Sequence, residues 1–240
     1  MARLTGVFVT PGEIFDSVIA APVAHSNWLL PALLFIVVSW CGAVLLFAHP
    51  GLKHQLQEIQ EQAIQKQVES GKMTQQQADQ VIQMTSKYAG VGAIIGGFAG
   101  PVIVGFASPF FWGLMLWLAG LLFQRPFPYW KGVEAVGLSN TIAVLEAAAH
   151  WLLVAAMGNL FVSLSPALLF KGLEPTSFGY SALGAFSVIG LWCLGVRAVG
   201  LARLTGISFL AAAAWVFGTY YALVMGALAV GQMLQRLGGR

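Results

Sequence analysis

Five apolar runs dominate the sequence, and polar segments separate them. Each run is long enough to cross a hydrocarbon layer of about 30 Å, which takes about 20 residues of helix. The predicted spans cover residues 28–48, 97–123, 138–164, 180–199 and 207–233. We therefore expect an all-α integral membrane protein in which residues 28–240 form one five-helix bundle.

The charge-free stretch 88–124 is too long for one span and too short for two. As a single helix it would exceed about 50 Å at a rise of about 1.5 Å per residue. We expect its first part, "AGVGAIIGGFAG", to enter through the interface, and the span itself to begin near Gly97 or Gly100. Pro101 and Pro109 are expected to bend this helix.

Gly92, Gly96 and Gly100 recur every four residues in the same stretch. Small residues at this spacing let helices approach closely, so we expect a helix contact here. A nucleotide-binding loop is excluded, because no strand precedes these glycines and no Gly-Lys-Ser/Thr follows them.

Residues 51–88, between the first two spans, are polar and rich in glutamine, and we place them outside the bilayer. Gly71 divides the segment, and Thr74 with Gln77 predicts a capping box that starts a second helix. Apolar residues recur at helical period before the division, at Leu52, Leu56, Ile59 and Ala63. The pattern predicts a helical hairpin insert with an apolar stripe.

The stretch "FVTPGEIFDSVIAAP" within residues 1–27 could be mistaken for a secretory leader, but Glu13 and Asp16 interrupt its apolar region. Thr10 and Glu13 predict a capping box with Pro11 at the first helical position. The apolar face of this helix consists of Ile14, Phe15, Val18 and Ile19. We expect an amphipathic helix in the membrane interface, and the alternative is that its apolar face packs on the bundle.

Charged residues make up 9% of the chain, against about 25% in soluble proteins, which supports a membrane location. The net charge of +3 comes without a basic block, so no nucleic-acid partner is expected. Cys41 and Cys193 lack metal or disulfide spacing, and no metal or cofactor is expected. Five basic residues fall on one side of the five-span pattern: Arg3, Arg125, Lys131, Arg197 and Arg203. Seven fall on the other side, so the charge count does not fix the orientation.

Glu146 and His150 are the most informative ionisable residues, because they lie four apart near the middle of the third predicted span. Ionisable side chains inside a membrane are costly and often mark proton relays or binding sites. We predict that they line a polar seam in the bundle together with Asn140 and Asn159. The alternative is that Glu146 is neutral or hydrogen-bonded to His150 and only helps to hold neighbouring helices together.

Four segments carry a family resemblance: "LTGVFVTPGEIFDSVIAAP", "SPFFWGLMLWLAGLLF", "WKGVEAVGLSNTIAVLEAAAHWLL" and "FSVIGLWCLGVRAVGLARLTGISFLAAAAWVFGTYYALV". In order and spacing, over nearly the whole chain, they resemble the Yip (Ypt-interacting protein) family of multi-pass membrane proteins. The resemblance implies five spans, a cytoplasmic amino terminus and no enzymatic activity. Eukaryotic relatives are associated with Rab-type GTPases. This chain lacks their long amino-terminal region and adds the hairpin, so we expect a bacterial-type member in the inner membrane.

Two functions follow from these patterns. The first is a non-enzymatic membrane protein that organises membrane or partner proteins, with a partner docked on the hairpin 51–88. The second is a small transporter or channel-like protein that uses the polar seam of the third span. The expected partners are the lipid bilayer, a protein at the hairpin and a second copy of the chain, and no catalytic constellation argues for an enzyme.

Overall fold

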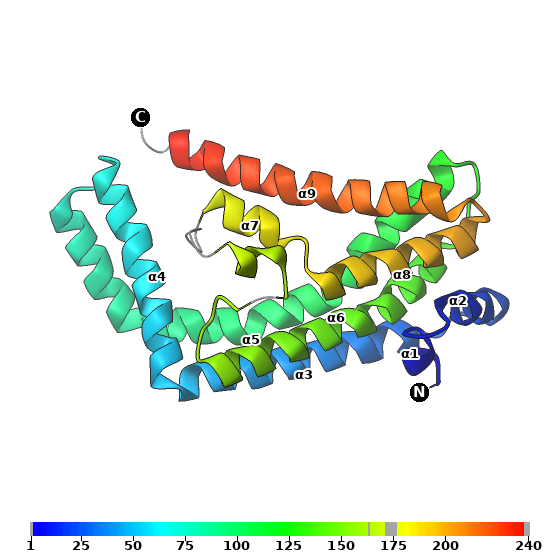
Figure 1. Ribbon diagram of the computed structural model, residues 1–240, viewed down its shortest axis with the longest axis horizontal. Coiled ribbons are helices and arrows are strands. Elements are labelled where there is room, and N and C mark those ends of the chain that lie inside the picture. Colours follow the sequence, from blue (N-terminus) through cyan, green and yellow to red (C-terminus); the bar gives the residue numbers. More distant parts are fainter. Residues whose placement is uncertain (1, 163, 171–176, 238–240) are drawn as a thin grey trace.

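A computed structural model describes residues 2–162, 164–170 and 177–237, and within them it contains helices and no strand (Figure 1). Five helices are long and apolar enough to cross a membrane: Ser26–Ala48, Ile94–Leu122, Tyr129–Met157, Val188–Thr205 and Phe209–Met233. The prediction of an all-α protein with five long apolar helices is confirmed. The chain is a multi-pass membrane protein by the length and composition of these helices.

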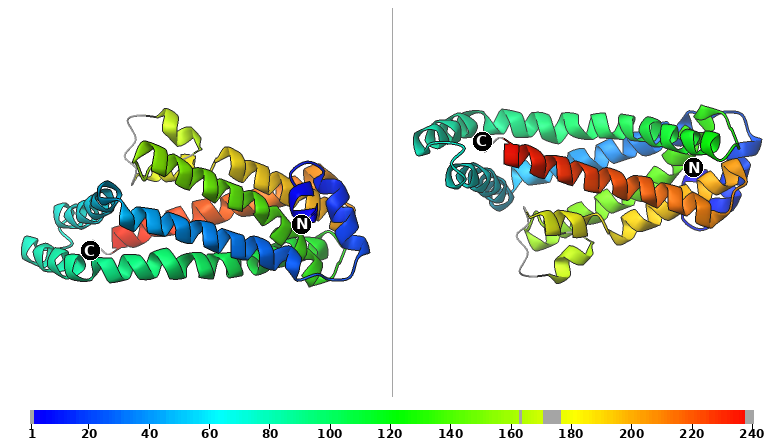
Figure 2. Two further views of the ribbon diagram at one scale, coloured as in Figure 1. Left: turned by 90° about the horizontal axis from the view of Figure 1, so that it is seen from below. Right: turned by 90° about the horizontal axis from the view of Figure 1, so that it is seen from above.

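The elements in chain order are α1 (Ala2–Gly6), α2 (Pro11–Ala20), α3 (Ser26–Ala48), α4 (Pro50–Glu69), α5 (Gln75–Leu122), α6 (Tyr129–Met157), the 3-10 helix η1 (Pro166–Leu169), α7 (Phe178–Gly184), α8 (Val188–Thr205) and α9 (Phe209–Leu237). Helices α3, α5 and α6 pack together, and α8 joins α6 to α9. The hairpin formed by α4 and the start of α5 lies at one end of the bundle, and α1 and α2 lie at the other (Figures 1 and 2). Towards the hairpin end, α9 diverges from α3 and α6 (Figure 1).

The crossing of α3 and α6 is the closest helix contact in the bundle. The Trp151 indole lies directly against the backbone of Gly42, and the Trp28 backbone lies against Gly137. A β-carbon at either glycine would overlap these neighbours. Glycine is therefore required at both positions for the two helices to approach as they do.

Helix α2 runs across the ends of the spans (Figures 1 and 2) and packs against α8 and α6. Phe15 and Val18 are each 1% exposed, whereas Ile19 is 42% exposed. Most of the predicted apolar face is thus buried on the bundle, which is the alternative stated for this helix. The predicted capping box is wrong: the Thr10 side chain makes no cap hydrogen bond, because its backbone (φ −128°, ψ 59°) lies outside the extended conformation of an N-cap.

Helix α5 is one continuous helix of 48 residues that includes both the second arm of the hairpin and the second span. It continues through Pro101 and Pro109, and its apolar part begins at Ile94, before the predicted start at Gly97. Among the described residues, the contact predicted for Gly92, Gly96 and Gly100 is not made, because a β-carbon there would meet none of their atoms within 4 Å. Gly97, Gly105 and Gly113 on the same helix face α3 and α6 instead.

The third and fourth helices are displaced from the predicted spans 138–164 and 180–199. Helix α6 begins nine residues earlier, since the charges of Lys131 and Glu134 pair inside the protein, and it ends at Gly158 in the left-handed conformation (φ 61°). The fourth span divides into α7 and α8, because the Ser187 hydroxyl accepts a hydrogen bond from Gly190 N and starts a new helix. As a result, Arg197 lies near the middle of α8 and not close to the end of the helix, as the predicted span 180–199 would have it.

The hairpin forms as predicted. Thr74 and Gln77 make both bonds of the capping box, at 3.3 and 2.9 Å. Leu52 is 1% exposed and Ala78 is fully buried, since α4 packs against both α3 and α5. The Gln55 side chain ties the hairpin to the segment after α6, donating to Gly158 O at 2.7 Å and accepting from Leu160 N at 3.0 Å. Of the predicted apolar stripe, Leu52 is buried, Leu56 and Ile59 are half-buried, and Ala63 is exposed.

Candidate functional site

Helix α6 carries two acidic residues, and the first of them, Glu134, is fully buried. One carboxylate oxygen accepts hydrogen bonds from Ala24 N and Asn27 Nδ2, both at 2.8 Å. The other pairs with Lys131 Nζ at 2.9 Å. The buried carboxylate is thus held by two hydrogen bonds to one oxygen and by an ion pair at the other, all from the protein itself.

Lys131 extends this network to the end of α2. Its ammonium donates to Val18 O and Ala21 O, both at 2.7 Å, where the last carbonyls of α2 lack helical partners. The network thereby joins α2, α3 and α6. Sequence reasoning missed it, although the spacing of three between Lys131 and Glu134 is typical of a helical ion pair.

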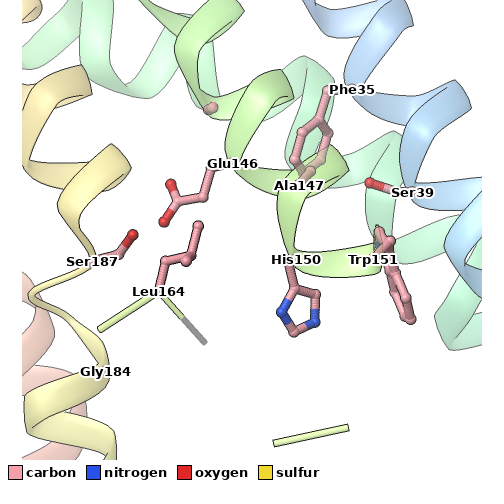
Figure 3. A pocket seen from close by; sticks show the side chains of 10 residues that line it. Phe35, Ser39, Glu146, Ala147, His150, Trp151, Leu164, Gly184 and Ser187 are labelled. Atoms are coloured by element: carbon pink, nitrogen blue, oxygen red, sulfur yellow. The ribbon is translucent and has the colours of Figure 1, made fainter. Parts of the chain in front are cut away.

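The second acidic residue, Glu146, lines an open cavity of ≈ 360 Å³. Its walls come from α3, α6, the loop after α6, the end of α7 and the residue before α8 (Figure 3). The polar groups on these walls are Ser39, Glu146, His150 and Ser187, and the other lining residues are Phe35, Ala143, Ala147, Trp151, Leu164 and Gly184. The cavity thus holds two ionisable groups and two hydroxyls among mostly apolar walls.

The Glu146 carboxylate points from α6 towards Ser187 and the start of α8 (Figure 3). Both of its oxygens would lie 3.5 Å from a β-carbon at Gly190, so the absence of a side chain there makes room for the carboxylate. A negative charge beside the first turn of a helix is favourable, because the backbone N–H groups of that turn point towards it. No donor among the described side chains bonds to this carboxylate, so it remains available to a ligand.

His150 lies one turn further along α6 and points away from Glu146 (Figure 3). Its ring lies edge-on to Trp151, with 5.3 Å between the ring centroids. No ion pair joins Glu146 to His150 in the described part of the chain. The two side chains line one cavity, and the hydrogen bond that is one form of the structural alternative is not formed between them.

The two asparagines of the predicted seam lie outside this cavity. Asn140 faces Arg197 on α8, whose Nη2 donates to the Asn140 side-chain oxygen at 2.7 Å. Asn159 follows the end of α6 and accepts a hydrogen bond from Phe161 N at 2.9 Å, which shapes the loop. Of the four predicted residues, the structure brings together Glu146 and His150 only.

Arg197 is a functional candidate that the sequence analysis used only in the charge count. It is 7% exposed and lines a second cavity of ≈ 110 Å³ between α3, α5, α6 and α8. This cavity shares Phe35 and Ala143 with the cavity at Glu146, so the two lie next to each other along α3 and α6. The signal that could have found Arg197 is Gly206, a helix stop nine residues later that makes Arg197 an interior residue of a span.

The arrangement can bind a polar solute and exchange protons with it. A carboxylate and an imidazole are the side chains that most often transfer protons near neutral pH. Within the described residues, no group of three or more His, Cys, Asp or Glu side chains comes close enough to hold a metal ion.

Comparison of the chain with protein-family models, with curated proteins and with solved structures finds no match. The resemblance to the Yip family therefore stays a prediction from the four segments that suggested it.

Proposed function

We propose that this protein is a non-enzymatic membrane carrier that takes a small polar solute into the cavity between α3, α6 and α8. The observation that supports this most is the Glu146 carboxylate, which faces a cavity inside the helix bundle without a donor among the described side chains. An intramembrane carboxylate is costly, so one that serves packing alone would be bonded as Glu134 is. Its place in the cavity suits a group that meets a proton or a solute.

In this proposal Glu146 and His150 exchange protons with the cavity, and Ser39 and Ser187 supply hydroxyls to the solute. Phe35 and Ala143 separate the cavity at Glu146 from the one at Arg197. Movement of α9 relative to α6 would alter access, since α9 diverges from this helix at the hairpin end (Figure 1). Coupling of proton movement to solute movement is the expected behaviour.

Proton flux into liposomes tests the proposal. The purified protein is reconstituted with an internal pH dye, in buffers that contain potassium, chloride and phosphate, and a pH gradient is imposed with the membrane potential clamped. We expect the gradient to collapse faster than in empty liposomes, and Glu146→Gln to remove the difference. Leu145→Ala is the matched control, because Leu145 is the neighbouring residue of α6 and 43% exposed. Equal rates for wild-type and empty liposomes would refute the carrier function.

The second candidate is a Yip-type protein of the bacterial inner membrane that organises partner proteins. It is favoured by the hairpin, whose outer surface is polar and whose base is fixed to the bundle through Gln55. Replacement of residues 51–88 by a short Gly/Ser linker would remove both arms of the hairpin and keep the apolar part of α5. Loss of specific crosslinked partners in this variant, with proton flux retained, would favour the organising role. An unchanged set of partners would argue against it.

A further inference from the structure

Arg197 is a buried cation for which the described residues provide no counter-charge. The ion pairs among them join Lys131 to Glu134, Arg203 to Asp16 and His54 to Glu58, and none includes Arg197. Glu146 lies against Gly190, about two turns or 10 Å away along α8. An uncompensated buried charge is strongly unfavourable, so a counter-ion from outside the chain is expected at this position.

The surroundings of Arg197 hold the guanidinium in place but do not satisfy it. Nη2 donates to the Asn140 side-chain oxygen, and the guanidinium carbon lies 4.9 Å from the centroid of the Trp112 ring. The buried Nε has no hydrogen-bond partner in the part of the chain that the structure describes. A guanidinium presents five N–H donors in a planar fork, so donors remain for a bidentate oxygen ligand.

The cavity of ≈ 110 Å³ beside Arg197 has room for such a ligand, since a single water needs only about 10–15 Å³. Ser108 on α5 and Asn140 on α6 add a hydroxyl and an amide, and Gly105 keeps one wall free of a side chain. The remaining lining residues are apolar and belong mainly to α3. The cavity therefore offers one positive charge, neutral polar groups and no carboxylate.

We propose that this cavity binds an oxyanion through Arg197, with Asn140 and Ser108 as neutral polar partners. The role of this site rests on the carrier function proposed above. In that role the oxyanion is the solute, and Glu146 and His150 in the adjoining cavity move the proton that accompanies it. The same chemistry is offered by a free small anion such as phosphate and by the phosphate of a lipid headgroup. The experiment separates these two sources.

Thermal unfolding of the purified full-length protein in a mild nonionic detergent tests binding of a free anion, because a ligand that binds only the folded state raises Tm. Inorganic phosphate is titrated against sodium chloride at constant ionic strength. We expect a saturable rise in Tm for the wild type and an affinity at least roughly 30-fold weaker for Arg197→Gln. Arg203→Gln is the matched control, because it removes the same charge from the same helix at an exposed position.

Native mass spectrometry tests the lipid source, with the protein taken from nanodiscs that contain phosphatidylglycerol. Retention of one such lipid by the wild type and by Arg203→Gln, but not by Arg197→Gln, with no response to inorganic phosphate, would support the site and assign it to a lipid. If Arg197→Gln does not fold, Arg197→Lys keeps the charge but not the fork, and weaker binding is expected. Absence of binding from both sources, or equal binding by the wild type and the Arg197 variant, would overturn the proposal. Binding is measured without transport, so its failure and that of the carrier function are separate results.

Discussion

Glu134 and Glu146 lie twelve residues apart on the same helix, and their surroundings differ in almost every respect. Glu134 is fully buried, and its two oxygens are bound by an ammonium, a backbone N–H and a side-chain amide. Glu146 faces an open cavity, and no described side chain donates to it. The first carboxylate joins three helices, whereas the second leaves its acceptor capacity free.

The difference shows which polar groups of a membrane bundle are structural. A charge whose partners are all supplied by the chain stabilises one arrangement of helices, as at the end where α2 meets α6. A charge in a cavity without such partners adds little to packing and is retained for another reason. The two carboxylates of α6 therefore differ in how many bonds the described residues supply to them.

Removal of Glu134 is expected to have the largest effect. Glu134→Ala leaves the Lys131 ammonium buried without its carboxylate, which costs about 3–5 kcal/mol of the free energy of unfolding. Chemical unfolding in mixed micelles measures the loss. A cost below about 1 kcal/mol would mean that the network joining α2, α3 and α6 is not a major source of stability.

Gly42 and Gly96 repeat the comparison for packing, since Gly42 lies against the Trp151 indole and Gly96 has open space around it. Gly42→Ala should destabilise the protein by about 1–3 kcal/mol, because α3 and α6 must separate to admit the methyl group. Gly96→Ala should not lower the free energy of unfolding, and it serves as the control. Equal effects of the two variants would contradict the observed helix crossing.

Two helix caps give the same comparison of a bonded with an unbonded side chain, with a smaller expected effect on stability. The Thr74 side chain accepts a bond from Gln77 N, whereas Thr10 makes no cap bond. Thr74→Ala should destabilise the start of α5 by about 1 kcal/mol, and hydrogen exchange over residues 75–84 should become faster. Thr10→Ala should leave exchange in α2 unchanged. Faster exchange in α2 would show that the Thr10 hydroxyl caps it after all.

The smallest effect on stability is expected for Glu146→Gln. Because no described donor bonds to the carboxylate, the amide should keep the free energy of unfolding within about 0.5 kcal/mol of the wild type. The same unfolding measurement as for Glu134→Ala checks this. A loss above about 1 kcal/mol would mean that Glu146 holds helices together, which is the structural alternative.

The number of long apolar helices, the hairpin and the capping box of the hairpin could be predicted from the sequence, because they depend on local patterns. Long apolar runs, a glycine stop and a Thr–Gln pair act within a few residues of one another. The start of α6 could not be predicted in this way, since Lys131 and Glu134 mark a helix end only when they face water. Their pairing depends on Asn27 and on the end of α2, more than a hundred residues away in the chain.

The residues of the candidate site also divide into those that a local sequence pattern predicts and those that depend on packing between helices. Glu146 and His150 could be found from their spacing alone, and both line one cavity. Asn140 was grouped with them by position along α6, but it faces α8, which pattern along a single helix does not reveal. Arg197 was expected near the end of the span 180–199 and was counted with the basic residues on one side of the membrane. The short break at Ser187 starts the fourth helix eight residues later, so Arg197 lies near the middle of α8.

The central claim is that the cavity at Glu146, which lies between the helices, is open to water. Cysteine labelling tests this claim most directly. Ala147 lines the cavity, and Leu145 lies two residues away at nearly the same depth, outside the cavity and 43% exposed. Each is replaced by cysteine in a protein without Cys41 and Cys193, reconstituted in liposomes and treated with a charged methanethiosulfonate. We predict rapid labelling of the Ala147→Cys variant and almost none of the Leu145→Cys variant, because only the first faces water. Equal labelling of the two, or faster labelling at residue 145, would contradict the account.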